Sequence, residues 1–298
     1  ILDEKKCGQC IPLNRLRNTI RIGNNKCRIA IDARLVFHKY FSSFWKIVAE
    51  SDHFSYERVY IECSKRIKDF CKSLTNEGIE QVWCLDGNRS DDKLATSRRI
   101  LSKEPRLIEM ATIHKRCSQA LSVVDTVAHA LAPYAFLKEY WPLCDEPVSD
   151  SPTAQESMFD QIGMLKKMLA KYPVIPKDFT EMMETELRKQ GCEFLLVPEI
   201  SEGEKLCVYA VQSGYCQAVF TTDTDVLPMG VRYVVKEIKD GAARVYSYSQ
   251  ALRNLGMSHE QFLSLCILLG NDFNNGVEGL GKVKCLTEVM KAGFNIYD

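Results

Sequence analysis

Two aspartates set two positions apart carry the clearest chemical signal in the sequence. Residues 217–220 (Gln-Ala-Val-Phe) have the pattern of a short buried strand, and Asp223 and Asp225 follow it after two threonines. In an open α/β sheet, ligands bind beyond the carboxyl ends of the strands. Carboxylates concentrated there repel one another unless a cation binds, and a hard divalent ion prefers oxygen ligands. Taken alone, the segment fits a polar turn with helix-capping aspartates equally well.

Five more acidic residues lie at or just beyond the ends of expected elements. The complete set of candidate metal ligands is Asp32, Asp86, Glu202, Glu204, Asp223, Asp225 and Asp272. If one pocket gathered them, they would repel by several kcal/mol without neutralisation. Two Mg²⁺ or Mn²⁺ ions would neutralise them, and such a pair can activate a water and stabilise the leaving oxygen of a phosphodiester. The alternative is that most of these residues are helix caps.

The two glutamates set a condition on the local structure. Residues two apart lie on nearly opposite sides of a helix, so Glu202 and Glu204 converge only if Glu202 precedes the first turn. Other chemistries lack support, because the five histidines form no cluster and no phosphate-binding glycine loop of the Walker type is present. Cys7 and Cys10 give half of a zinc-site spacing without a second pair, so we do not expect zinc.

The elements that must position these residues follow an α/β pattern. Buried strands are predicted at 27–32, 81–87, 193–197 and 217–220, with intervening helices at 35–48, 58–74, 179–189 and 205–212. A hairpin is predicted around Asp240-Gly241, and Ser258 with Gln261 forms a capping box for an apolar helix. Residues 1–25 look like a polar surface arm. We therefore expect an α/β fold with a mostly parallel central sheet flanked by helices.

The middle of the chain does not fit this alternation. Residues 1–104 are assigned to the N-terminal part of the main domain and 177–298 to its second part. Residues 105–176 are assigned to a helical or partly disordered insertion that lies outside the sheet.

Composition limits the partners and the compartment. The chain has 39 basic and 39 acidic residues, so nucleic acid must be bound by local patches. Its thirteen cysteines are odd in number and scattered through apolar segments. With no signal peptide or long apolar span, we expect reduced thiols, an intracellular location in nucleus or cytoplasm, and no membrane partner.

Two groups of residues are candidates for holding nucleic acid. Lys93, Arg98 and Arg99 follow Asp86, and cations beside an acidic pocket would hold a phosphate there, although an ordinary solvated helix also explains them. The turn with Gly279 and Gly281 offers backbone N–H groups to a phosphate, and Lys282 and Lys284 follow it. A plain helix-packing turn is the alternative for this segment.

At these residues the chain resembles the flap endonuclease and xeroderma-pigmentosum-G (Rad2-like) family of structure-specific 5′ nucleases. Four segments carry the resemblance, in the family's order: Ile29–Asp32, Val82–Gly87, Glu202–Glu204 with Thr222–Asp225, and Leu268–Phe273 with Gly279–Gly281. Residues 221–230 also resemble herpesvirus virion host shutoff proteins, which are RNA endonucleases built on this fold.

The resemblance implies a PIN-like nuclease with two metal ions. Asp32, Asp86, Glu202 and Glu204 would serve the first ion, and Asp223, Asp225 and Asp272 the second. Lys93 and one of Arg98 or Arg99 would steer the scissile phosphate. Residues 279–281 would belong to a helix-two-turn-helix that binds duplex DNA with a K⁺ ion. We expect no clamp-binding tail after residue 298, and we expect a monomer.

The chain departs from the family pattern at several positions. Asn88-Arg89 replaces a proline pair, and Val283 stands where a basic residue is usual. The alanines that flank the glutamates in the family are replaced, which leaves Ser201-Glu202-Gly203-Glu204-Lys205. The expected activity is metal-dependent hydrolysis of branched or 5′-ended DNA. One alternative is an RNA endonuclease on the same fold. The other is not an enzyme but a non-catalytic scaffold that binds nucleic acid.

Overall fold

The computed structural model of the 298-residue chain describes most, but not all, of it. The described residues are 2, 7–22, 26–49, 55–87, 94–119, 132–144, 155–171, 173, 175–176, 178–198, 202–270 and 276–292, without the side chains of 94–104, 119, 132–136 and 155–159. The chain forms two compact units. Unit 1 consists of Ile1–Phe37, Arg66–Leu94 and Thr180–Asp298, and unit 2 of His38–Lys65 and Ala95–Phe179.

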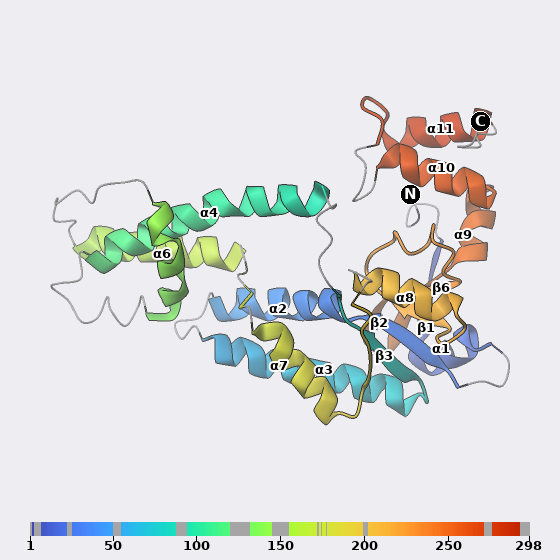
Figure 1. Ribbon diagram of the computed structural model, residues 1–298, viewed down its shortest axis with the longest axis horizontal. Helices are drawn as coiled ribbons and strands as arrows, with labels where there is room; N and C mark the ends of the chain where they lie inside the picture. Colours follow the sequence, from blue (N-terminus) through green and yellow to red (C-terminus); the bar gives the residue numbers. More distant parts are fainter. Residues whose placement is uncertain are drawn as a thin grey trace. The chain divides into compact units, whose positions relative to one another are not determined.

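A seven-stranded sheet forms the centre of unit 1 (Figure 1). Its strands, in spatial order, are β1 (Gly8–Pro12), β7 (Ala242–Ser247), β6 (Tyr233–Lys239), β5 (Ala218–Phe220), β2 (Arg28–Asp32), β3 (Glu80–Cys84) and β4 (Glu193–Leu195). Adjacent strands from β6 to β4 run parallel to one another, whereas β7 is antiparallel to both β6 and β1. The predicted α/β class with a mostly parallel sheet is confirmed.

The helices lie between and after these strands. Their bounds are α1 (Leu13–Ile20), α2 (Ala33–Ala49), α3 (Tyr56–Asn76), α4 (Leu94–Gln119), α6 (Gln155–Lys171), α7 (Phe179–Lys189), α8 (Gly203–Gln212), α9 (Tyr248–Leu255), α10 (His259–Leu269) and α11 (Lys282–Ala292), with a 3₁₀ helix η2 (Ala132–Leu143). The described ranges contain no helix that is both long and apolar enough to cross a lipid bilayer.

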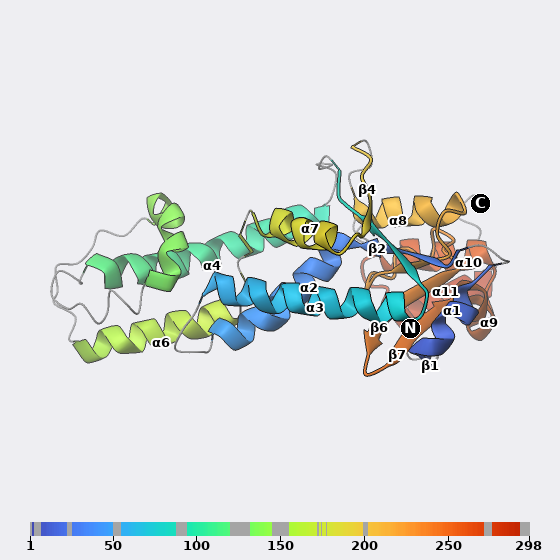
Figure 2. The same ribbon diagram turned by 90° about the horizontal axis from the view of Figure 1, so that it is seen from below.

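Helices cover both faces of the sheet in unit 1 (Figures 1 and 2). Successive strand residues point to opposite faces, so Val82 and Cys84 join the buried cluster with α8 while Trp83 points the other way. The Trp83 ring stacks on Phe37 of α2 at 5.9 Å and meets Phe70 of α3 edge-on at 6.0 Å. Burial of such rings contributes about 1.5–3 kcal/mol each. This packing fixes the strand that leads to Asp86.

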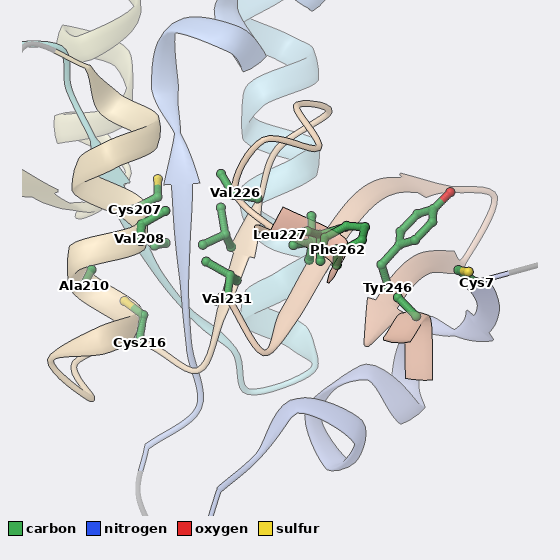
Figure 3. Packing of buried hydrophobic residues seen from close by; sticks show 14 of the residues in the cluster. Cys7, Cys207, Val208, Ala210, Cys216, Val226, Leu227, Val231, Tyr246 and Phe262 are labelled. Atoms are coloured by element: carbon green, nitrogen blue, oxygen red, sulfur yellow. The ribbon is translucent and has the colours of Figure 1, made fainter. Parts of the chain in front are cut away.

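A second packed group supports the segment after β5. Val226, Leu227 and Val231 are buried with Phe262 of α10 in one cluster (Figure 3). A turn closes between them, in which the Gly230 N–H donates to the Leu227 carbonyl at 2.9 Å. The loop that carries Asp223 and Asp225 is therefore held at its far end by a dry core.

The prediction of a surface arm for residues 1–25 is wrong. Gly8–Pro12 forms an edge strand that pairs with β7, with Gly8 opposite Tyr246. In α1, Leu13, Leu16 and Ile20 are buried, and this i, i+3, i+7 spacing marks a helix with one apolar face. The polar and basic residues between these positions obscured that spacing.

Two local predictions are confirmed. Asp240 and Gly241 form the hairpin turn between β6 and β7 with φ values of 50° and 73°. Ser258 and Gln261 make both hydrogen bonds of the capping box at the start of α10. Both depend on contacts between near neighbours in sequence.

Unit 2 is helical in its described residues. It contains α4, η2 and α6 and consists of residues 38–65 and 95–179. This span is wider than residues 105–176, which the sequence analysis assigned to an insertion. Two tryptophan N–H groups tie its segments together. Trp45 donates to the Leu169 carbonyl, and Trp141 donates to His114 Nδ1 at 3.3 Å.

Candidate active site

Three aspartates meet at the carboxyl edge of the parallel strands. Asp32 ends β2 and lies opposite Cys84, the last residue of β3, so Asp86 follows immediately beyond that edge. Ile31 pairs with Phe220 at the end of β5, and Asp223 follows three residues later. The negative charges of Asp86 and Asp223 both act on Asp32. The parallel register therefore brings together carboxylates from three distant parts of the sequence.

Asp32 is the most buried of the three. Its side chain is almost fully covered, and this burial, together with the charges of Asp86 and Asp223, raises the pKa of its carboxyl to about 6. The Leu35 N–H donates to Asp32 Oδ1 at 3.1 Å and, like the Arg34 charge, opposes this rise in pKa. The ionised form that dominates at neutral pH is thus unfavourable, and a bound cation would stabilise it.

Asp86 has a partner on each carboxylate oxygen. The Gly203 N–H donates to Oδ1 at 2.8 Å, and Arg34 Nη1 donates to Oδ2 at 2.6 Å. The sequence reasoning missed both Gly203 and Arg34. The sequence does contain a signal for Arg34. The helix dipole disfavours a cation in the first turn of a helix unless an anion lies nearby, and α2 has no acidic residue in its first turn. The anion that pairs with Arg34 must therefore come from another element.

Gly203 connects the glutamate pair to the aspartates. A Cβ atom at this position would lie 3.0 Å from the Cys84 carbonyl oxygen, 3.1 Å from Asp86 Oδ1 and 3.6 Å from Asp32 Oδ1. Glu202 is the N-cap residue of α8, with extended φ and ψ of −129° and 129°, and Glu204 lies in the first turn. Glu202 thus precedes the helix, which is the condition that the sequence set for the two side chains to converge.

We expect Gly203→Val to damage this junction. The branched side chain meets a backbone carbonyl and the Asp86 carboxylate, so α8 must shift, at a cost of about 1–3 kcal/mol. Urea unfolding in EDTA measures this loss. Gly163→Val in α6 is the matched control, because nothing lies within 4 Å of a Cβ there and its φ is outside the left-handed region. Wild-type stability in Gly203→Val would contradict the close packing described here.

Asp223 and Asp225 form a compact turn after β5. The Asp225 N–H donates to Asp223 Oδ1 at 3.0 Å, and the Asp223 N–H donates to Thr221 Oγ1 at 3.1 Å. Asp225 and Glu204 line a cavity of about 540 Å³, and Lys236 and Lys282 belong to the same lining. Apolar side chains of α10 complete that lining. The cavity thus places acidic and basic groups beside an apolar wall.

The connection from α10 to α11 contains the glycine turn predicted to bind nucleic acid. Gly279 has a φ of 79° and is exposed, as are Gly281, Lys282 and Lys284. Gly276 is fixed sterically, because a Cβ there would lie 2.7 Å from the Leu268 carbonyl oxygen. The turn is accessible to a ligand, and its binding of nucleic acid stays a prediction.

Four of the predicted site residues cannot be placed in this arrangement. Asp272 and Lys93 lie outside the described residues. Arg98 and Arg99 lie in α4, but the structure does not describe their side chains. In the described part of the chain, no group of three or more His, Cys, Asp or Glu side chains is already arranged to hold a metal ion. The donor chemistry nevertheless fits a hard divalent cation, because it consists of carboxylates around the buried Asp32.

Comparison with known sequences identifies related proteins. Residues 196–272 match the XPG I-region family. Flap endonuclease 1 of Entamoeba dispar is 33% identical over 123 residues, which cover 40% of this chain and 32% of the relative. A putative RAD2-like endonuclease of Frog virus 3 is 32% identical over 123 residues, covering 40% of this chain and 33% of the relative. The match thus spans about a third of the length of these curated relatives.

Comparison with solved structures extends the similarity in fold to almost the whole chain. The catalytic core of Rad2 in complex with a DNA substrate matches with a TM-score of 0.56 and 17% identity, covering 100% of this chain and 69% of that one. Flap endonuclease-1 from Methanococcus jannaschii matches with a TM-score of 0.56 and 16% identity, covering 96% of this chain and 75% of that one.

Proposed function

We propose that this chain is a Rad2-like 5′ nuclease that hydrolyses phosphodiester bonds in branched or 5′-ended DNA. The observation that carries the proposal is the meeting of Asp32, Asp86 and Asp223 at one sheet edge. Hydrolysis of a phosphodiester needs positive charge close to the reacting phosphate. A pocket of carboxylates at this edge would bind metal ions, which supply that charge. The fold shared with a Rad2 core solved with DNA supports a nucleic-acid substrate.

The proposed cofactors are two Mg²⁺ or Mn²⁺ ions. Asp32, Asp86, Glu202 and Glu204 would hold the first, and Asp223, Asp225 and Asp272 the second. Such ions, when bound, supply activation of the attacking water and stabilisation of the leaving oxygen. The chain fixes the carboxylates through the Leu35, Gly203 and Asp225 N–H groups, which orient one oxygen each of Asp32, Asp86 and Asp223.

Substrate positioning is assigned to two further regions. Lys93 with Arg98 or Arg99 would hold the scissile phosphate. Gly279 and Gly281 would offer N–H groups to a duplex phosphate, with Lys282 and Lys284 adding charge and a K⁺ ion completing the turn. Lys282 supports a link between the regions, because it lines the same cavity as Glu204 and Asp225.

The proposed location is a reducing compartment, the nucleus or the cytoplasm. All thirteen cysteines are free thiols, and most are buried. Proteins in oxidising compartments commonly use so many cysteines as disulfides. We propose that the protein acts as a monomer on nucleic acid.

The test compares a 5′-flap DNA with a single-stranded RNA of equal length, each with Mg²⁺ and with EDTA. We expect metal-dependent cleavage of the flap DNA near its branch and slower cleavage of the RNA. Preferential cleavage of the RNA would replace the proposal with the RNA endonuclease activity. If neither substrate is cut while Mn²⁺ still binds, the nuclease proposal fails.

A further inference from the structure

Arg34 brings a positive charge of the chain itself into the carboxylate pocket. Its Nη1 lies 2.6 Å from Asp86 Oδ2, and its charge also lowers the pKa of Asp32. The residue lies in the first turn of α2, where the helix dipole disfavours a cation by about 0.3–1 kcal/mol. The neighbouring carboxylates offset this cost. The position of Arg34 is therefore explained by the pocket and not by its helix.

The contact with Arg34 completes the hydrogen bonding of Asp86. One oxygen accepts from the Gly203 N–H and the other from Arg34. Gly203 is backbone at a helix start and stays in place, whereas the Arg34 side chain is 47% exposed and can rotate away without opening the core. Arg34 is thus the exchangeable partner of Asp86.

We propose that Arg34 is an internal counter-ion that competes with divalent metal for Asp86 and, once displaced, binds a phosphate of the nucleic acid. The inference rests on the proposed function, since it takes the carboxylate pocket as the metal site. A guanidinium suits the second role, since its planar fork matches phosphate oxygens.

The first arm of the test measures Mn²⁺ binding by calorimetry, without substrate. Arg34→Ala removes both the competitor for Asp86 and a charge that repels the metal, so we expect about threefold to tenfold tighter binding at low salt. The gain should shrink at high salt, because the pair is partly exposed. Lys26→Ala is the matched control, since Lys26 pairs with Glu80 at 2.8 Å at the opposite end of β2 and should leave Mn²⁺ affinity unchanged.

The second arm measures cleavage of the flap DNA at saturating metal. Arg34→Ala should lower kcat/KM about tenfold, mainly through a higher KM, and Arg34→Lys should recover part of the loss. If Arg34→Ala binds Mn²⁺ no more tightly than the wild type, or if its kcat/KM is unchanged, the inference is overturned. The proposed function still stands in that case, provided that the wild-type protein binds Mn²⁺ and cleaves the flap DNA. A wild-type protein that binds no Mn²⁺ overturns both. Urea unfolding in EDTA shows whether each variant is folded.

Discussion

Asp223→Asn is expected to lower the rate of Mg²⁺-dependent cleavage by about 10³-fold or more, which corresponds to a barrier higher by about 4 kcal/mol. The amide removes the negative charge that Asp223 adds to the pocket beside Asp32. It retains a carbonyl oxygen that can accept the Asp225 N–H, so the turn should survive. The measurement is single-turnover cleavage of the flap DNA.

The control for this variant makes the same chemical change elsewhere. Asp240→Asn lies in the exposed hairpin turn at a positive φ, which asparagine tolerates well. It should cleave at the wild-type rate. Near-normal cleavage by Asp223→Asn in Mg²⁺ would remove Asp223 from the proposed mechanism.

Asp32→Asn is expected to stabilise the metal-free protein at neutral pH. Burial, Asp86 and Asp223 raise the pKa of Asp32 from 3.8 to about 6, so the folded state prefers the protonated carboxyl. The protonated Asp32 carboxyl contributes its full stabilisation of the folded state below pH 4, and this stabilisation is lost as the pH rises to about 6. At about 1.4 kcal/mol for each pKa unit, this loss amounts to about 3 kcal/mol. Asparagine removes the charge and can keep the Leu35 hydrogen bond.

Urea unfolding in EDTA as a function of pH measures this effect. Wild type should lose stability between pH 4 and 6, whereas Asp32→Asn should lose less over that range and exceed wild type by up to about 3 kcal/mol at pH 7.5. Saturating Mn²⁺ should reverse the order, because a cation stabilises the ionised Asp32. A destabilised Asp32→Asn at pH 7.5 in EDTA would contradict the unfavourable burial of this charge.

The sequence by itself determined the elements whose signals are local. The strands before Asp32, Asp86 and Asp223 are short apolar segments, and the hairpin at Asp240-Gly241 and the cap at Ser258 depend on near neighbours. Parallel strands put their carboxyl ends at one edge, so the meeting of these aspartates could be predicted without coordinates. Their roles as metal ligands remain proposals.

Only the tertiary structure decided the contacts between residues far apart in sequence. Gly8 became part of a strand because its partner is Tyr246, and no pattern within residues 1–25 announces that pairing. Arg34 acquired its place at Asp86 across 52 residues, and Gly203 across 117. A residue's type and near neighbours set its local conformation, but the partner of a charge or of a free N–H depends on which segments the folded sheet places beside it.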